Sequence, residues 1–505
     1  MGNRTTMDIP EWAKKHQTKG TTIETHKTKN GTTNYYLRKI TSKYNKQKHR
    51  AQKISGQYLG KITPEGLIPP KQQQIKNQLV GSKITLKEHG ATQLILNTNQ
   101  QTINHLKTHY PTWWKEILTI AIFRLIHQTP LKNTNFYYQT SYLSETLPNA
   151  DLTSKTLGPL LRKIGTERET ITNFMHHYIQ GSKHVAVDLT HVFSLSENVI
   201  SSTLGHNSKG EYVPQINLFY LFSLDRMMPA YFRVVVGSVN SVKTLKLSIK
   251  ESKAENAVVV GDKGFYSEAN VEALEQANLQ YVLPLKRNSS LLDYGVIKLG
   301  DKSKFGGFFR YGRRVIWFYE YKELCGGRRV VVFLDERLKV EEEKDVLGRI
   351  DEDRFSGEGD ALEVERRLSL FYENQFRFGT IGVVTSLGES ACEVFEVLKS
   401  RVDIEQMYDS FKNVLRADRM FVRDDFQVEG WMFVNFVALL FYYQLRNMLV
   451  ERKLLARFSV LDILVHLSRI YKIKIGNDWE LSEIPKKTLK ILEKLDKHIT
   501  KNLQS

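Results

Sequence analysis

KHVAVDLT, residues 183–190, is an apolar run rich in β-branched residues, and it holds one acid, Asp188. Such a run is typical of a buried β-strand. A carboxylate inside a buried strand costs on the order of several kcal/mol unless it is paired or bound to metal. A second run, AVVVGDKGFY at 257–266, places Asp262 directly after its strand, where open α/β sheets bind ligands. Taken alone, either Asp could also be a structural cap or turn residue.

A third acid, Glu405, lies in a helical stretch, SRVDIEQMYDSFK at 400–412. Arg401, Glu405, Tyr408 and Lys412 stand at i, i+4, i+7 and i+11, so we expect them to share one helix face. A solvated row of ion pairs would explain this face, but it would leave the two strand acids unexplained. Two carboxylates on strands and one on a helix are what a site needs to hold two divalent metals and cut phosphodiesters.

The order of expected elements around these acids indicates an α/β layered sheet. Three strands are followed by helix, strand, helix and strand, an order similar to that of the ribonuclease H-like fold. The expected strands are 185–193, 215–222, 231–236, 257–260 and 280–285, and the helices are 242–253 and one from about 267 to 277.

The alternation breaks between about 289 and 380. Two β-rich runs, 315–321 and 329–334, flank Leu324-Cys325-Gly326-Gly327, which predicts a hairpin. A charged, helical stretch from Lys339 to Arg367 follows, and 380–385 is expected to be a strand that rejoins the sheet. Helices are expected from about 113 to 178, over most of the chain beyond 385, and in a Lys-rich tail past Glu480.

The charge of the chain points to a polyanionic partner. There are 73 Lys and Arg against 55 Asp and Glu, giving a formal net charge of +18, and nucleic acid is favoured over membrane. Residues 1–110 are polar and basic, and Ser42–Arg50 is a basic cluster with an aromatic inside it. There Lys46, Lys48 and Arg50 are candidate DNA-binding residues, although a solvated charged loop explains them equally well. Lys286 and Arg287, after the fifth strand, are further candidates.

Two cysteines, Cys325 and Cys392, show no pairing or metal pattern and indicate a reducing compartment. The N-terminus carries no apolar signal core. The longest apolar run, 431–443, is too short for a membrane span and is expected to be a buried helix. We therefore expect a cytoplasmic, nucleoid-associated protein with no membrane partner.

Taken together, these motifs resemble the DDE transposases of bacterial and archaeal insertion sequences, in the cut-and-paste branch with a β-rich insertion. VDLT at 187–190 resembles the first-Asp strand, GHNSKG at 205–210 with PQINL at 214–218 the block after it, and GDKGFY at 261–266 the second-Asp block. Arg401, Glu405 and Lys412 fit the branch's Tyr-Arg-Glu-Lys signature. The signature's Tyr falls on Leu398, and the expected Pro-Gly-Asn block reads VGSVN at 236–240. Neither departure removes a metal ligand.

The resemblance implies an α/β protein with a ribonuclease H-like catalytic core interrupted by a β-rich insertion, a basic N-terminal DNA-binding region and helical flanks. The expected divisions are the N-terminal region at 1–110, a helical region at 111–180, the core at 181–288 and 380–455, the insertion at 289–379 and a helical tail at 456–505.

The resemblance also implies the chemistry. Asp188, Asp262 and Glu405 would be catalytic ligands of two Mg²⁺ ions, for which Mn²⁺ can substitute. Arg401, Lys412 and Tyr408 would contact DNA, and Trp317 on the insertion hairpin would stack on a flipped base, although a packing role explains this Trp as well. The partners would be the element's terminal inverted repeats and target DNA, bound by a homodimer.

Two other functions are compatible with parts of the pattern. A ribonuclease H-like nuclease would need the three acids but not the large N-terminal region or the insertion. A non-enzymatic DNA-binding protein derived from a transposase would not need the three acids. The sequence leaves open the terminal repeat, the target preference, the oligomeric state and whether excision passes through a hairpin.

Overall fold

The structure is a computed structural model, and it describes residues 9–28, 31–45, 49–70, 84–194, 196–206, 212–235, 241–322, 328–355 and 361–495. Contacts divide the chain into two units. One unit comprises Met1–Lys87 and Tyr471–Ser482, and the other comprises Glu88–Ile470 and Glu483–Ser505. The division after Lys87 leaves the helices between 90 and 109 in the larger unit.

The first unit contains an antiparallel sheet in the order β1-β2-β3-β4. Its elements are the short helix α1 (Glu11–Lys14) and strands β1 (Thr21–Lys27), β2 (Thr33–Asn45), β3 (Arg50–Thr63) and β4 (Gly66–Ile68). A small core of Ala13, Ile23, Leu37 and Ile62 holds them together. The basic cluster of Ser42–Arg50 thus falls at the end of the long β2–β3 hairpin.

The larger unit is built on a sheet of eleven strands, with the main order β12-β13-β14-β15-β11-β10-β6-β8-β7. Strands β9 and β16 pair with β8 and β6, respectively. The strands that carry the sequence motifs are β6 (His184–Ser194), β7 (Thr203–His206), β8 (Tyr212–Ser223), β9 (Met228–Val235), β10 (Val258–Val260) and β11 (Gln280–Leu285).

These strands and their helices follow the predicted order. Strands β6, β8 and β9 pair antiparallel, whereas β10 pairs parallel with β6 and with β11. Helices α10 (Ser241–Ser252) and α11 (Glu268–Gln276) connect β9 to β10 and β10 to β11. The Ser267 side chain accepts a hydrogen bond from the backbone N–H of Asn270 and so caps α11. The chain is therefore a mixed α/β protein.

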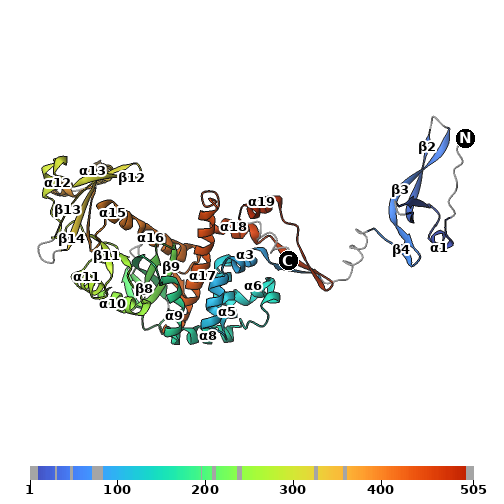
Figure 1. Cartoon of the computed structure of the whole chain (residues 1–505), viewed down its shortest axis with the longest axis horizontal. Helices are drawn as coiled ribbons and strands as arrows, with labels where there is room; N and C mark the ends of the chain where they lie inside the picture. Colours follow the sequence, from blue (N-terminus) through green and yellow to red (C-terminus); the bar gives the residue numbers. More distant parts are fainter. Residues whose placement is uncertain are drawn as a thin grey trace. The chain divides into compact units, whose positions relative to one another are not determined.

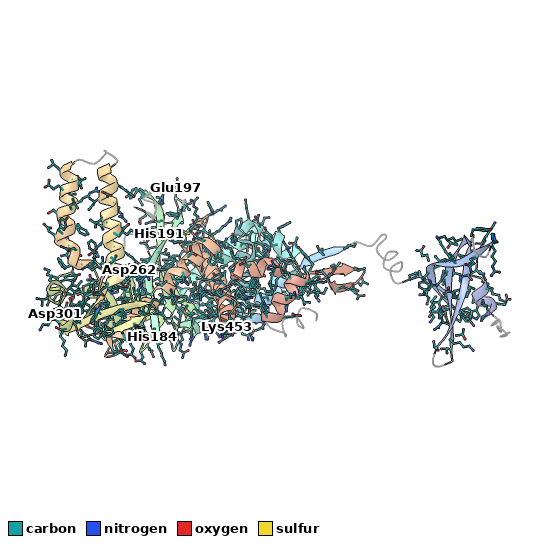
Figure 2. All side chains as sticks on the ribbon, turned by 90° about the horizontal axis from the view of Figure 1, so that it is seen from above. His184, His191, Glu197, Asp262, Asp301 and Lys453 are labelled. Carbon is teal, nitrogen blue, oxygen red and sulfur yellow. The ribbon has the colours of Figure 1, made fainter. Side chains whose placement is uncertain are left out.

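The β-rich segment after β11 continues the same sheet. Each strand here pairs antiparallel with the next one along the chain: β12 (Gly307–Tyr311), β13 (Arg314–Lys322) and β14 (Arg329–Asp335). Strand β15 (Thr380–Thr385) lies between β14 and β11 and pairs antiparallel with both. The charged stretch forms two helices, α13 (Glu336–Phe355) and α14 (Ala361–Asn374), which stand side by side away from the sheet (Figure 2). Short turns lie at α12 (Gly295–Leu299), η2 (Lys302–Lys304) and η3 (Gln375–Arg377).

A helical layer lies on the other side of the larger unit, around α17 (Asp425–Glu451) (Figure 1). This helix contacts α5, α8 and β9. The helices of this layer that precede β6 in the chain are α3 (Gly90–Thr98), α4 (Gln100–His109), α5 (Trp114–His127), η1 (Leu131–Asn133), α6 (Thr134–Thr140), α7 (Leu143–Thr146), α8 (Ser154–Thr166) and α9 (Arg168–Ile179).

Helix α17 contains the apolar run at 431–443. By length and composition it is the one helix among the described residues that could cross a membrane, but 67% of its most apolar window is buried inside the protein. Core helices of soluble proteins have this placement, so the helix is weak evidence for a span. The buried helix expected from the sequence is observed.

Two local features differ from the sequence expectations. The helix expected over 400–412 is divided into α15 (Ala391–Ser400), α16 (Val402–Asp409) and a π-helical turn, η4 (Ser410–Val414). After α18 (Val460–Leu467), the chain forms strands β17 (Tyr471–Ile475) and β18 (Asp478–Leu481), which pair in a small sheet with β5 (Thr85–Glu88), before α19 (Lys486–Leu495).

Candidate active site

Asp188 lies in the middle of β6, opposite Tyr220 of β8. This segment forms a strand near the centre of the sheet because valines and other apolar residues occupy both of its faces. The Asp188 side chain is half-buried, and its Oδ1 accepts a hydrogen bond of 2.8 Å from the backbone N–H of Leu189. No ion pair to this carboxylate is found among the described residues.

Asp262 reaches the same level of the sheet from the neighbouring strand. Val260, the last residue of β10, is paired in parallel with Ala186, and Asp262 and Asp188 each follow two residues later. The chain then turns, because Asp262 Oδ1 accepts a hydrogen bond of 2.7 Å from the backbone N–H of Gly264. Figure 2 labels the half-buried Asp262 side chain. The two strand acids therefore lie on adjacent strands in matching register.

Helix α16 brings Glu405 to these strands through Tyr408. The Tyr408 hydroxyl donates a hydrogen bond of 2.7 Å to the backbone carbonyl oxygen of Asp188. The ring is 8% exposed and packs edge-on against Tyr220, with ring centroids 5.8 Å apart. Because its hydroxyl and ring are engaged in this way, Tyr408 positions α16 against β6.

Glu405 is paired with Arg401 in this structure. Its Oε1 lies 2.5 Å from the Arg401 guanidinium, and the Glu405 side chain is 51% exposed. Arg401 itself falls at the break between α15 and α16. Among the described residues, no group of three or more His, Cys, Asp or Glu side chains is close enough to hold a metal ion.

The three acids nevertheless share an electrostatic field. Burial raises the pKa of Asp188 to about 6, and the negative charges of Asp262 and Glu405 add to that rise. The Leu189 N–H and the Arg401 charge act in the opposite direction. A carboxyl group whose pKa is raised by burial and by neighbouring acids is a group that a bound cation would stabilise in its charged form.

Lys412 lies on the π-helical turn that follows α16. Burial lowers the pKa of this half-buried amine, while the charges of Asp418 and Asp188 oppose that change. Lys412 in turn contributes to lowering the pKa of His191, whose main cause is burial; Figure 2 labels His191, on β6 beyond Asp188. Lys412, which the helix pattern grouped with Glu405, thus lies near Asp188 on a π-turn and not on a continuous α-helix.

The other candidates lie farther along the sheet. Lys286 is exposed at the end of β11, while Arg287 is half-buried and bonded to Glu342 at 2.7 Å and to the Thr380 carbonyl oxygen at 3.0 Å. Trp317 is half-buried on β13. Its ring contacts Phe305 and Phe308 with centroids 5.8 and 5.1 Å away, and the Lys302 amine lies 4.9 Å from its centre.

In the N-terminal unit, Arg50 is exposed at the start of β3, and Tyr44 on the facing strand is 60% exposed. Lys46 and Lys48 lie outside the described residues. The VGSVN block at 236–240 and part of the GHNSKG block, 207–210, also lie outside them.

Residues 180–441, just over half of the 505 residues, match the family described as the transposase DDE domain. The chain belongs to this family. It therefore carries a transposase domain that includes Asp188, Asp262 and Glu405, while the N-terminal sheet and the C-terminal helices lie outside the match.

The solved structures that resemble the chain include two transposase complexes. One is a piggyBac transposase synaptic complex with hairpin DNA, with 11% identity over 75% of this chain and 69% of the other, at a TM-score of 0.35. The second is a Mos1 transposase paired-end complex with the left transposon end, with 12% identity over 30% of this chain and 53% of the other, at a TM-score of 0.15. Nothing about the site follows from likenesses this slight. No curated protein matches the chain.

Proposed function

We propose that this transposase-family protein cleaves and rejoins DNA by metal-dependent phosphoryl transfer, with Asp188, Asp262 and Glu405 as catalytic metal ligands. One observation carries the proposal. Asp188 on β6 and Asp262 just beyond the end of β10 each follow the paired residues Ala186 and Val260 by two positions, and the helix bearing Glu405 is hydrogen-bonded to the carbonyl of Asp188 itself. Acids that only formed structural ion pairs would not need to converge in this way, whereas ligands of a shared metal site would.

The donor chemistry of the site fits divalent metal. Carboxylate oxygens are the ligands that Mg²⁺ and Mn²⁺ prefer. Burial, and after it the negative charges of Asp262 and Glu405, raise the pKa of Asp188, so a bound cation would stabilise its ionised form. Asp188 and Asp262 would hold the metal. Glu405 would complete the set of ligands by leaving its ion pair with Arg401 and binding the metal instead. Two bound Mg²⁺ ions would activate the attacking oxygen and stabilise the leaving oxygen.

The topology supports a ribonuclease H-like core. Strands run β9-β8-β6-β10-β11, with the first three antiparallel and the last two parallel to β6. This arrangement supports the ribonuclease H-like core that we propose. On this interpretation the segment from about 289 to 379 is the insertion of a cut-and-paste transposase of a prokaryotic insertion sequence, and 380–455 returns the chain to the core with Glu405.

The chain's cations suit the proposed partner. Arg401 and Lys412 flank the acids on α16 and the π-turn, where they would contact the phosphates on either side of the scissile bond. Lys286 and Trp317 would contact DNA farther out, with Trp317 exchanging its ring contact with Phe308 for stacking on a base. The N-terminal region, through Arg50 and its neighbours, would read the terminal repeats. A homodimer in the cytoplasm, bound to the nucleoid, would hold two ends together.

A stand-alone nuclease and a non-enzymatic DNA-binding protein remain the alternatives. The nuclease would not need the N-terminal sheet, which has a core of its own. The non-enzymatic protein would gain nothing from keeping an acid half-buried in the sheet without an ion pair. Both features therefore favour the transposase.

The deciding experiment incubates the full chain with DNA that carries the sequences flanking its own coding region, with Mg²⁺ or with a chelator, and maps the strand breaks. We expect breaks at the ends of inverted repeats, joined products when target DNA is added, and neither with the chelator. Breaks scattered without regard to the repeats would favour the nuclease, and DNA binding without any break would favour the non-enzymatic protein.

A further inference from the structure

A cavity of about 1440 Å³ lies in the larger unit, outside the three acids. Helix α8 forms one wall, residues 416–423 between the π-turn and α17 form the other, and Arg124 of α5 and Trp431 of α17 lie at its base. We call it the α8 groove. Its volume exceeds the ~300–1,000 Å³ of ordinary small-molecule pockets, so it has room for an extended ligand.

Both walls of the α8 groove are basic. Arg162, Lys163 and Arg419 line it with acidic partners nearby, at 2.6, 2.7 and 3.9 Å from Asp424, Glu167 and Asp418. Four further cations line it, are exposed, and have no ion pair among the described residues: Lys132, Lys155, Arg416 and Arg423. Asp418 is the one acid among the described lining residues. The groove therefore has a surplus of positive charge facing the space inside it.

Arg124 adds a buried charge to this surplus. It is 3% exposed, and its guanidinium donates to neutral oxygens: Asn435 Oδ1 at 3.1 Å, the Thr129 carbonyl at 2.9 Å and the Leu415 carbonyl. No carboxylate pairs with it among the described residues. A buried cation held only by neutral acceptors is costly for the folded chain, and a nearby anion would offset that cost.

The rest of the groove is apolar and aromatic. Leu157, Leu161 and Met420 lie among its lining residues, and Phe421 is 81% exposed on the 416–423 wall. The Trp431 indole N–H is buried with no hydrogen-bond acceptor among the described residues. An anionic ligand with flat, weakly polar parts matches this combination. A duplex hides its bases, so it would contact the cations but not the apolar lining.

The groove is joined to the proposed active site by β6. Arg419 and Met420 of its wall form strand β16, which pairs with Phe193 and Ser194 at the end of β6. Asp188 lies five residues earlier on the same strand, which corresponds to ~16 Å at ~3.3 Å per residue. At ~3.4 Å of rise per nucleotide, that distance corresponds to about five nucleotides from the cleaved bond.

We propose that the α8 groove binds unpaired nucleotides of a DNA strand, with its cations on the phosphates and Phe421 stacked on a base. The proposal rests on the proposed function for its partner, DNA, and adds a single-strand site a few nucleotides from the three acids. It gives the transposase a place to hold the strand that separates from the duplex beside the scissile bond.

The test measures fluorescence anisotropy of the full chain with a labelled oligothymidine of about twelve nucleotides, a matched abasic strand and a hairpin duplex. Phe421→Ala should weaken oligothymidine binding about 10-fold and change duplex binding less than about 3-fold. The wild-type preference for oligothymidine over the abasic strand should disappear in this variant, because the preference comes from stacking.

The charge contribution needs its own variants. The double variant Lys155→Gln with Arg423→Gln should lose more oligothymidine affinity than Lys246→Gln with Arg469→Gln. The latter removes two exposed cations that lie outside the groove and have no ion pair within the part of the chain that the structure describes. Tyr372→Ala, a similarly exposed aromatic at 62%, is the matched control for Phe421→Ala. Melting curves confirm that each variant is folded, and a variant that fails this check is replaced by Phe421→Ser or Lys155→Gln alone.

Equal losses of duplex and oligothymidine affinity would overturn the proposal and make the groove a duplex path. Oligothymidine affinity within about 2-fold of wild type in both groove variants would also overturn it. The assay contains no metal and scores no cleavage. Failure here therefore leaves strand cleavage by Asp188, Asp262 and Glu405 standing, and a chain that never cleaves DNA can still pass this test.

Discussion

Asp188 is an acid near the centre of the sheet, and burial is the main cause of its raised pKa. Asp262 on the next strand and Glu405 on α16 make the ionised form still less favourable. The folded chain without metal therefore tolerates this residue at a cost to stability. Such a cost is expected where a site is kept for chemistry rather than for folding.

Replacement of Asp188 by its neutral isostere should expose that cost. We expect Asp188→Asn to raise the free energy of unfolding by about 1 kcal/mol at neutral pH without metal, because the buried charge is removed while the shape is kept. Added Mg²⁺ should stabilise the wild type but not the variant. Urea denaturation with and without Mg²⁺ measures both effects. The control Asp351→Asn, on an exposed part of α13, should change neither the free energy of unfolding nor its response to Mg²⁺. An Asp188→Asn chain less stable than the wild type without metal would contradict this explanation.

The candidate acids could be found from the sequence because each strand acid interrupts or ends an apolar run. The relative positions of Asp188 and Asp262 could not be predicted from the sequence, since they depend on how β6 pairs with β10. The bond from Tyr408 to the Asp188 carbonyl and the pairing of Arg401 with Glu405 depend on how α16 docks. A one-face helix pattern grouped Tyr408 with the DNA-contacting residues, but burial of its ring gives it a positioning role in this structure.

At the scale of elements, two glycines allow α8 and α17 to cross closely. A Cβ at Gly430 would lie 2.0 Å from the Leu161 carbonyl oxygen, and one at Gly165 would lie 1.8 Å from the Phe426 carbonyl oxygen. Both neighbours are backbone atoms, so only a shift of one helix could make room. This crossing also fixes one wall and the base of the α8 groove.

Gly430→Ala should therefore destabilise the chain by about 1–3 kcal/mol or more, because the added methyl forces the helices apart. Gly348→Ala is the matched control. It adds the same methyl to helix α13, where nothing lies within 4 Å, and helix propensity predicts a gain of up to ~1 kcal/mol. Thermal melts of the two variants give the comparison. Equal stability of Gly430→Ala and wild type would show that the helices are not held this closely.

A histidine cluster joins α4 to α9 and predicts a dependence of stability on pH. His105 stacks on His177 with ring centroids 3.9 Å apart, and His109 Nε2 lies 3.0 Å from His177 Nε2. Burial, with the charges of His177 and His109, lowers the pKa of His105 to about 4. The unfolded chain, with an ordinary His pKa of ~6.5, then binds more protons at mildly acid pH. The stability from neutral His105 is full above pH ~6.5 and is lost as the pH falls towards about 4.

We expect the free energy of unfolding to fall between pH ~7 and ~5 and His105→Gln to remove about 1 kcal/mol of that fall, after allowance for partial exposure of the ring. Urea titrations at several pH values measure it. His16→Gln, outside the cluster, should keep the wild-type slope. An unchanged slope in His105→Gln would show that the cluster does not titrate with folding.

Strands with a strong apolar pattern could be predicted from the sequence, and the hairpin of β13 and β14 could be predicted from its turn. The break at Arg401 and the π-turn could not, because the side-chain pattern is helical throughout and docking decides where the turn widens. The β17–β18 hairpin was missed because its strands are short and carry charged residues, Lys472 and Lys474 on β17 and Asp478 and Glu480 on β18. Among its described residues, the N-terminal sheet has a core of four buried apolar residues, too few to stand out in a polar region.

At the scale of the whole molecule, the chain consists of two units and carries a net charge of +18. The family match begins at residue 180 and leaves the β1–β4 sheet outside. We propose that this sheet, with Tyr44 and Arg50 exposed at the end of its long hairpin, recognises the DNA ends.

Deletion of residues 1–70 should therefore leave salt-sensitive, non-specific DNA binding but remove the preference for terminal repeats. Removal of only this segment keeps α3 and α4, whose Leu94, Ile95 and Leu106 are fully buried in the larger unit. Competition binding between repeat DNA and scrambled DNA measures the preference. A truncated chain that still selects the repeats would place recognition in the larger unit.

The most direct test of the central claim is a cleavage time course on DNA carrying the element ends, with Mg²⁺, for Asp188→Asn, Asp262→Asn and Glu405→Gln. Each should bind the DNA as the wild type does and lose cleavage by at least ~100-fold, because each removes a charged metal ligand. Asp403→Asn, two residues from Glu405 on the same helix α16, is the matched control and should cleave normally. Wild-type cleavage by any of the three variants, or the same loss in Asp403→Asn, would contradict a site built from these three acids.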